Sequence, residues 1–267
     1  MKATCLTLSV FFGLTVAASA FDADDLRQFK ETGTCTDCDL QKSKLQSDIM
    51  PGVNLSGSNL RDAILKNVNL TKANLKEADL RRADMEKSDL TEADLTEATL
   101  RNTDLEKAII KGANLYQADL REVDLENAEA QNANFQEADL RNANMKRGNF
   151  SKADFSNTKF SNSNLKRAIL NQAIFKNARM KDVRLTRADL KNADFTNAEL
   201  ARSNFFRADM SNSIFSGADL EDAILWGANL SGADLSDVKD LEQSQVENAC
   251  GNAKTRLPAG LYISTCQ

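Results

Sequence analysis

A period of five residues dominates the chain and limits what it can fold into. Every fifth residue from Leu40 to Leu235, here called a centre, marks forty pentapeptides without insertion or deletion, and 39 centres are Leu, Ile, Met or Phe; Ala130 is the exception. The residue two before each centre is Ala, Ser, Thr, Val, Gly or Cys in 39 of the forty pentapeptides, with Asp48 as the exception. Two positions kept in phase for so long indicate one repeated structural unit.

The period itself excludes two regular structures. A straight helix turns about 100° per residue, so a step of five rotates successive centres by about 140° and scatters them around the cylinder. In a flat strand, an odd step sends successive centres to opposite faces. A chain that turns a corner in every pentapeptide keeps both the centre and the small residue inside. The period therefore predicts a solenoid.

The repeats resemble those of the pentapeptide-repeat family. The family pattern A-(D/N)-L-x-x stands here as Ala73-Asn74-Leu75, Ala93-Asp94-Leu95 and Ala233-Asp234-Leu235. The resemblance implies an all-β fold, a right-handed quadrilateral β-helix with four pentapeptides per coil. Forty pentapeptides would then make about ten coils.

The phenylalanines support a coil of twenty residues. If residues twenty apart stack, one centre column is a run of five rings: Phe135, Phe155, Phe175, Phe195 and Phe215. We expect these rings to be piled inside the solenoid, because coils about 4.8 Å apart bring them into contact. In the neighbouring column Ala130 lies between Ile110 and Phe150, so Phe150 either leans into the free space or leaves a small cavity.

Both ends of the repeats carry segments that predict caps, because open coils would expose strand edges and core. We expect a helix from Asp22 to Thr34, and a second from Asp237 to Ala249 followed by a tail. The chain then divides into a signal peptide (1–20), an N-terminal capping helix with a Cys-containing turn (21–37), the β-helix (38–237), and a C-terminal capping helix and tail (238–267).

The first twenty residues have the composition of an export signal. Lys2 is followed by an apolar run from Cys5 to Ala17 and by small residues up to Ala20, where a signal peptidase would cut. The run is shorter than the roughly 18 apolar residues of a membrane span. We therefore expect cleavage after Ala20, no transmembrane segment in the mature chain, and a periplasmic or secreted location.

Four cysteines remain after that cleavage, an even number that suits an oxidising compartment. Cys35 and Cys38 form a CxxC motif beside the first repeat, while Cys250 and Cys266 lie at the other end. CxxC motifs also occur as redox dithiols and as halves of zinc sites. We favour structural disulfides, because no histidine is present to complete a zinc site and no thioredoxin-like βαβ pattern surrounds the motif; the sequence leaves the pairing open.

Charge is uneven along the repeats. Residues 141–210 carry 15 basic and 6 acidic side chains, whereas residues 21–140 carry 15 and 25 and residues 211–267 carry 3 and 8. In a twenty-residue register, the basic band contains one column of arginines: Arg147, Arg167, Arg187 and Arg207. Its flanks are mainly Asn or Ile until Asp189 and Asp209, and Lys146, Lys166 and Arg184 lie close by. We therefore expect this column to be less well neutralised than a second arginine column. This column is either a solvated face or a site for a polyanion or an acidic protein, since arginine suits carboxylate and phosphate.

A second arginine column is expected to be neutralised. It consists of Arg61, Arg81, Arg101, Arg121 and Arg141. Aspartates lie two residues before three of its members, and Glu77, Glu97 and Glu137 lie one corner away, so we predict an ion-pair network there. Tyr116, Phe206 and Trp226, each directly after a centre, are secondary candidates for contact residues.

The composition disfavours catalysis. Without histidine there is no His-based triad, no imidazole base and no His metal site. Carboxylate catalysis would need acids that converge in a cleft, whereas here they recur regularly. We expect a non-enzymatic exported binding or scaffold protein, without cofactor, metal or nucleic-acid partner, that docks a protein or an anionic envelope polymer. The family resemblance implies one alternative, a DNA-mimic inhibitor of a topoisomerase, which the export signal and the basic band disfavour.

Overall fold

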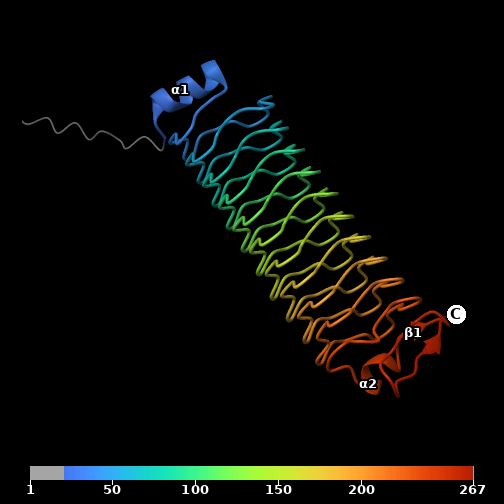
Figure 1. Ribbon diagram of the computed structural model, residues 1–267. Helices are drawn as coiled ribbons and strands as arrows, with labels where there is room; N and C mark the ends of the chain where they lie inside the picture. Colours follow the sequence, from blue (N-terminus) through green and yellow to red (C-terminus); the bar gives the residue numbers. More distant parts are fainter. Residues whose placement is uncertain (1–20, 267) are drawn as a thin grey trace, which may run out of the picture.

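A computed structural model describes residues 21–266, which wind into a rod of stacked coils (Figure 1). The expected signal peptide, residues 1–20, lies outside the described residues. Parallel bridges join the residue before each centre to the residue twenty positions later, from Thr34–Asn54 to Asp219–Lys239. The predicted twenty-residue repeat of the coil is therefore confirmed by backbone pairing, with one bridge for each pentapeptide. This pairing begins at Thr34, four residues before the predicted start of the repeats.

A tight turn closes each pentapeptide and explains the period. In the repeat that follows Leu60, the Ala63 N–H donates to the Leu60 carbonyl over 3.1 Å, and Asp62 has φ 57°. A positive φ at the third turn residue is the geometry of a type II turn. The polar residue before the centre supports the next turn: the Thr91 N–H donates to Asp89 Oδ1 over 2.9 Å. Asx side chains stabilise turns in this way, which accounts for the Asp or Asn of the pattern.

The core of the rod is made of the centres and the small residues that precede them. Every centre except Met50 is buried, and every small position except Asp48 is buried. Both exceptions lie in the first coil, where Met50 packs beside the exposed Ile49. The predicted phenylalanine column is confirmed: successive rings are stacked with centroids 4.8, 5.2, 4.9 and 4.8 Å apart.

The ring of Phe150 leans sideways toward the phenylalanine column, a direction that neither expected alternative included. It lies against Gly148, its own small residue, and its centroid is 6.2 Å from that of Phe135 and 6.0 Å from that of Phe155. Ala130, the smallest centre, is fully buried in the preceding coil. The large ring thus turns toward the phenylalanine column, and the glycine makes the room it needs.

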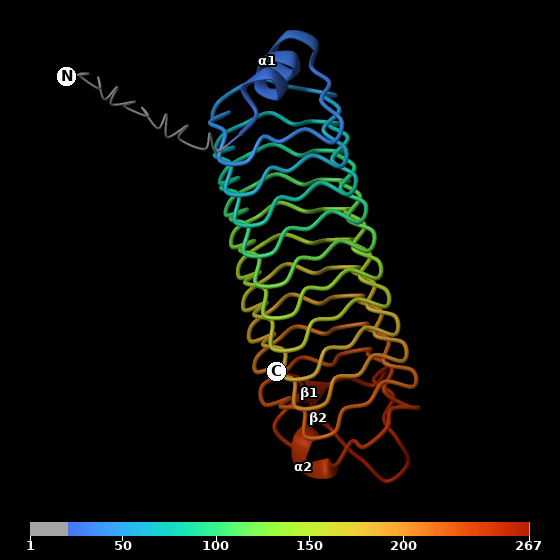
Figure 2. The same cartoon turned by 90° about the vertical axis from the view of Figure 1, so that its left-hand side faces the viewer.

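Helix α1 (Ala23–Thr32) lies across the N-terminal end of the rod (Figure 2). Asp22 caps it by accepting from the N–H groups of Asp24 and Asp25, and Gly33, with φ 67°, ends it. The helix faces the first coil with Phe29, which is buried. The Asp25 carboxylate accepts from the Asp39 N–H of that coil over 2.7 Å, so α1 also satisfies part of the open sheet edge.

The C-terminal segment differs from the expected helix and tail. Helix α2 is only one turn long (Gln243–Val246), because the coil pairing continues through Lys239. After α2 the chain returns to the sheet: Cys250 bridges to Asn229 and Arg256 bridges to Asp234. Strand β1 (Cys250–Gly251) also pairs in parallel with β2 (Ser264–Thr265). The predicted helix from 237 to 249 is correct only for Gln243–Val246, because residues 237–242 extend or follow the last coil instead.

Within residues 21–266, neither helix has the length or the apolar character that crossing a membrane requires.

Candidate functional site

The four arginines predicted as a binding site lie in one column along a corner of the rod. The bridges fix residues twenty apart at the same position of successive coils. Each arginine follows its centre by two residues, at the turn position with positive φ, and each is exposed: Arg147 (φ 55°), Arg167 (φ 59°), Arg187 (φ 57°) and Arg207 (φ 54°). The structure therefore brings all four together, and the turn projects them into solvent. We call them the arginine column.

Most of this column has no acidic partner. Arg147 pairs with Glu126, with Nη1 and Oε1 3.0 Å apart, and Lys146 shares the same carboxylate at 3.5 Å. Arg167, Arg187 and Arg207 form no ion pair among residues 21–266. The aspartates expected nearby, Asp189 and Asp209, instead pair with Lys191. Lys191 reaches both carboxylates, so the arginine column is less well neutralised than the second arginine column, as the sequence predicted.

The part of the column around Arg147 and Arg167 forms a shallow depression. It has a volume of about 290 Å³ and is lined by Glu126, Lys146, Arg147, Lys166 and Arg167. Four cations from two successive coils thus surround one carboxylate. This geometry can hold an anionic group against two guanidinium forks, which bind carboxylate and phosphate oxygens in pairs.

An aromatic stack ends the column. The rings of Phe206 and Trp226 are parallel, with centroids 5.0 Å apart, and the guanidinium of Arg207 lies 5.1 and 5.5 Å from the two centroids. Sequence reasoning treated these aromatics as single exposed residues and missed the cluster. The signal was present, because 206 and 226 are twenty apart and therefore stack in the register. Tyr116 stands apart, and its hydroxyl donates to Glu137 over 3.2 Å.

The second arginine column provides an internal comparison. Each of its members pairs with an aspartate: Arg61 and Arg81 with Asp79, Arg101 with Asp119, Arg121 with Asp119 and Asp139, and Arg141 with Asp139. The predicted ion-pair network is therefore confirmed. The glutamates one corner away are not its partners among the described residues; Glu137 instead accepts hydrogen bonds from Tyr116 and Gln117.

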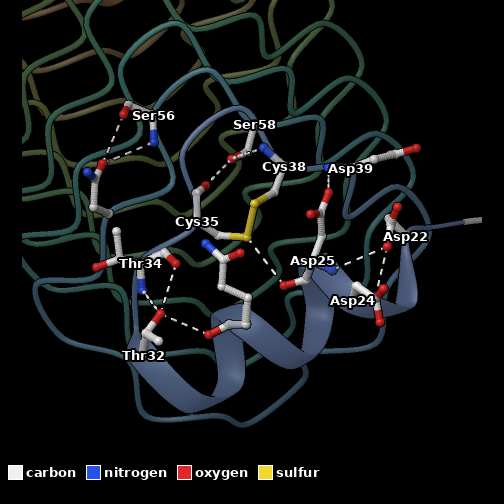
Figure 3. The surroundings of a disulfide bond; sticks show 12 residues. Asp22, Asp24, Asp25, Thr32, Thr34, Cys35, Cys38, Asp39, Ser56 and Ser58 are labelled. Carbon is white, nitrogen blue, oxygen red and sulfur yellow. Dashed lines mark hydrogen bonds between the residues drawn. A yellow bond between two sulfur atoms is a disulfide. The ribbon is translucent and has the colours of Figure 1, made fainter.

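Both cysteine pairs form disulfides, Cys35–Cys38 and Cys250–Cys266. Around the first bond, the Ser58 hydroxyl donates to the Cys35 carbonyl and accepts from the Cys38 N–H, and the sulfur of Cys35 lies 3.3 Å from the Asp25 carbonyl oxygen (Figure 3). The Asp25 carboxylate and the two sulfurs lie within 4.8 Å of one another. Disulfide sulfurs do not offer the thiolates that zinc binds. The contacts of Asp25 with Cys35 and Asp39 instead connect α1 to the first coil.

One depression gathers carboxylates. It has a volume of about 470 Å³ near the C-terminal end, and Glu221, Asp222, Asp240 and Glu242 are among its lining residues. All four are exposed. General acid catalysis by a carboxyl group depends on a desolvated environment that exposed side chains do not have. This cluster therefore does not change the expectation drawn from the absence of histidine.

Most of the chain is similar to known protein families and solved structures. The family model described as pentapeptide repeat region matches residues 148–225, and the one described as pentapeptide repeats (8 copies) matches overlapping segments across residues 35–147 and residues 213–250. A search of the curated proteins finds no match.

Similar solved structures include three repeat proteins. HetL, a pentapeptide repeat protein involved in heterocyst differentiation regulation from the cyanobacterium Nostoc sp. strain PCC 7120, is 26% identical, with 78% of this chain and 94% of that one covered and a TM-score of 0.42. A pentapeptide repeat protein from the Arabidopsis thaliana thylakoid lumen is 26% identical, with 44% and 81% covered and a TM-score of 0.34. QnrB1, a plasmid-mediated fluoroquinolone resistance protein, is 15% identical, with 79% and 92% covered and a TM-score of 0.31.

Proposed function

The chain belongs to the pentapeptide-repeat family, whose fold is a right-handed β-helix, and from this premise we propose that it is an exported, non-enzymatic binding protein. The signal-like composition of residues 1–20 and the two disulfides support export to a periplasmic or extracellular compartment. In this proposal the rod has about ten coils, closed by α1 at one end and by the returning C-terminal segment at the other.

The arginine column is the proposed docking site, and its partner is an acidic protein or an anionic polymer of the cell envelope. One observation carries this: three of the four arginines lack an acidic partner among the described residues, whereas every arginine of the second column has one. Like charges stacked in register destabilise a sheet unless they are compensated. A bound anion supplies the compensation that the chain itself does not.

Binding is tested with the mature protein, residues 21–267, and two defined probes, heparin and poly-glutamate. The variant R167E/R187E reverses the centre of the column. The matched control K152E/K181E makes the same change in net charge at two exposed lysines that form no ion pair among residues 21–266, and Lys152 has the same turn geometry as Arg167. We expect the affinity to fall tenfold or more in the first variant and little in the control.

Salt dependence gives a second readout of the same site. Because exposed charges are screened, wild-type binding should weaken as ionic strength rises, and the R167E/R187E variant should lose most of this dependence. If both variants bind either probe as the wild type does, the arginine column is a solvated face and the proposal fails. Export is tested separately, by fusing residues 1–20 to a reporter and measuring whether the reporter leaves the cytoplasm.

A further inference from the structure

One face of the rod carries opposite charges in its two halves. We call it the bipolar face. It consists of the residues directly before and directly after every fourth centre from Met85 to Leu185, so its members lie twenty residues apart in sequence. In three coils they are Asp84, Glu86, Asp104, Glu106, Asp124 and Glu126, and in the next three they are Asn144, Lys146, Asn164, Lys166, Arg184 and Thr186. The bridges keep these residues in two straight columns.

Charges of both signs are left uncompensated on this face. Asp104 and Asp124 form no ion pair among the described residues, and neither do Lys166 and Arg184. Asp104 lies between two further carboxylates of its own column, and its pKa is raised by burial and by the repulsion from Asp84 and Asp124. Among the described residues, one ion pair on this face joins the two halves, between Glu126 and Lys146 at their boundary, because the other charges are separated along the axis of the rod. A partner that presents the opposite order of charges can pair them.

We propose that this partner is a second copy of the chain, docked antiparallel through the bipolar face. A two-fold axis between the coils of Leu125 and Met145 inverts the order of the charges, so the acidic half of each copy meets the basic half of the other. Such an interface is isologous, with each contact made twice. It sets Asp84 opposite Arg184, Glu106 opposite Lys166, and Glu126 opposite Lys146.

The size of the face indicates a weak and reversible dimer. Six coils span about 24 Å at the spacing of paired strands, and only a few residues of each coil lie on the face. A standard stable interface buries about 800 Å² on each partner, which this strip does not reach. One more coil at each end sets Lys66 opposite Phe206, a cation–π pair. Association should therefore depend on charge and weaken with salt.

The arginine column takes no part in this docking. It lies at the corner beside the bipolar face, where the same two-fold sets Arg167 opposite Lys107 of the second copy. Like charges there do not favour association. The depression beside the column shares Glu126, Lys146 and Lys166 with the bipolar face, so an anion bound in it would compete with docking. The inference does not depend on the proposed function, and either can fail alone.

Charge exchange tests the pairing directly. The variant K166E/R184E reverses two of the three basic charges of the face, and D84K/E106K reverses two of its six acidic charges. Lysine is tolerated directly before a centre, since Lys159 already stands at such a position. Each variant alone should dimerise about a hundredfold more weakly than the wild type, because four contacts become repulsive. An equimolar mixture should regain association, since every reversed contact is then attractive. K152E/K181E serves again as the control and should dimerise as the wild type does.

Sedimentation velocity measures these equilibria up to millimolar protein at low and high salt, with circular dichroism to verify that each variant is folded. A photo-crosslinking amino acid at position 164 fixes the register, and we expect it to link to peptides around residue 104 of the other copy. A wild type that stays monomeric at low salt overturns the proposal. So does a mixture that fails to associate, or a crosslink to residues around 164, which would mean a parallel arrangement.

Discussion

The ring of Phe150 occupies the space that a Cβ on Gly148 would need, with its Cζ 2.9 Å from that position. Gly148 is the only glycine among the small positions that precede the forty centres, where alanine is commonest. Its φ is not positive, so the residue is not required by the backbone. Glycine is needed at this position because the ring of Phe150 turns sideways and leaves no room for even a methyl group on residue 148.

We therefore predict that Gly148→Ala destabilises the rod, although alanine is the consensus residue at this position. Overpacking a tight core typically costs about 1–3 kcal/mol, and we expect a loss in that range from urea unfolding. The double variant G148A/F150L should recover most of the loss, because leucine is the usual centre and needs less space. A G148A variant as stable as the wild type would show that the ring moves freely.

The stacked phenylalanines give a second prediction. Phe175 stacks on Phe155 and Phe195, with centroids 5.2 and 4.9 Å away, whereas Phe215 stacks on Phe195 alone. Each stacked pair contributes roughly 0.5–1.5 kcal/mol beyond burial. Phe175→Leu should therefore lower the free energy of unfolding by about 1 kcal/mol more than Phe215→Leu. Equal losses in the two variants would mean that area burial alone accounts for the column.

The sequence predicted those parts of the molecule that follow from its register. Once residues twenty apart stack, the phenylalanine column and the two arginine columns follow from counting, as does the pairing of Arg81 with Asp79 on the same turn. The same counting would have joined Phe206 to Trp226. Counting does not show whether a side chain can reach around a corner of the coil. The sequence therefore suggested Glu77 and Glu97 as partners of the second arginine column, with which they form no ion pair among the described residues.

The C-terminal end was the least predictable part for a physical reason. Residues 237–249 have scattered apolar positions that fit one face of a helix, and local pattern alone favours that structure. In the rod, however, the exposed edge of the last coil offers unpaired backbone groups, and Cys250 and Arg256 fill them by pairing with Asn229 and Asp234. Tertiary pairing of this kind has no signal in the local sequence.

The Cys250–Cys266 disulfide closes this returning segment, and its removal should loosen the end of the rod. The loop it closes is 16 residues long, for which the chain-entropy model gives roughly 3 kcal/mol. We expect C250S/C266S to lose about that much stability and to show faster hydrogen exchange at the Arg256 N–H, which donates to the Ala233 carbonyl. The Cys35–Cys38 disulfide closes a shorter loop, so the C35S/C38S variant should lose less stability. A C250S/C266S variant with unchanged exchange would mean that pairing alone holds the segment.

Asp104 gives a prediction about pH. Burial, together with the charges of Asp84 and Asp124, raises its pKa above the usual value, against a lowering contribution from the Glu106 N–H. A carboxyl group whose pKa is raised by folding binds protons more readily in the folded chain, so its ionisation costs stability, and that cost grows as pH rises through the raised pKa.

Replacing Asp104 with asparagine removes the charge and keeps an oxygen that can accept the Glu106 N–H hydrogen bond, which is 2.9 Å long. Asparagines already stack in this way on the rod, where Asn134 donates to Asn114 over 2.9 Å. We expect D104N to be more stable than the wild type at neutral pH, by less than about 1 kcal/mol because solvent screens the repulsion. Denaturant unfolding at several pH values should show this gain shrinking as pH falls through the raised pKa of Asp104, because the wild-type carboxyl group then becomes protonated as well. A gain that is the same at all pH values would mean that the asparagine acts through packing or hydrogen bonding, and a loss at neutral pH would mean that the charge of Asp104 is compensated in the folded rod.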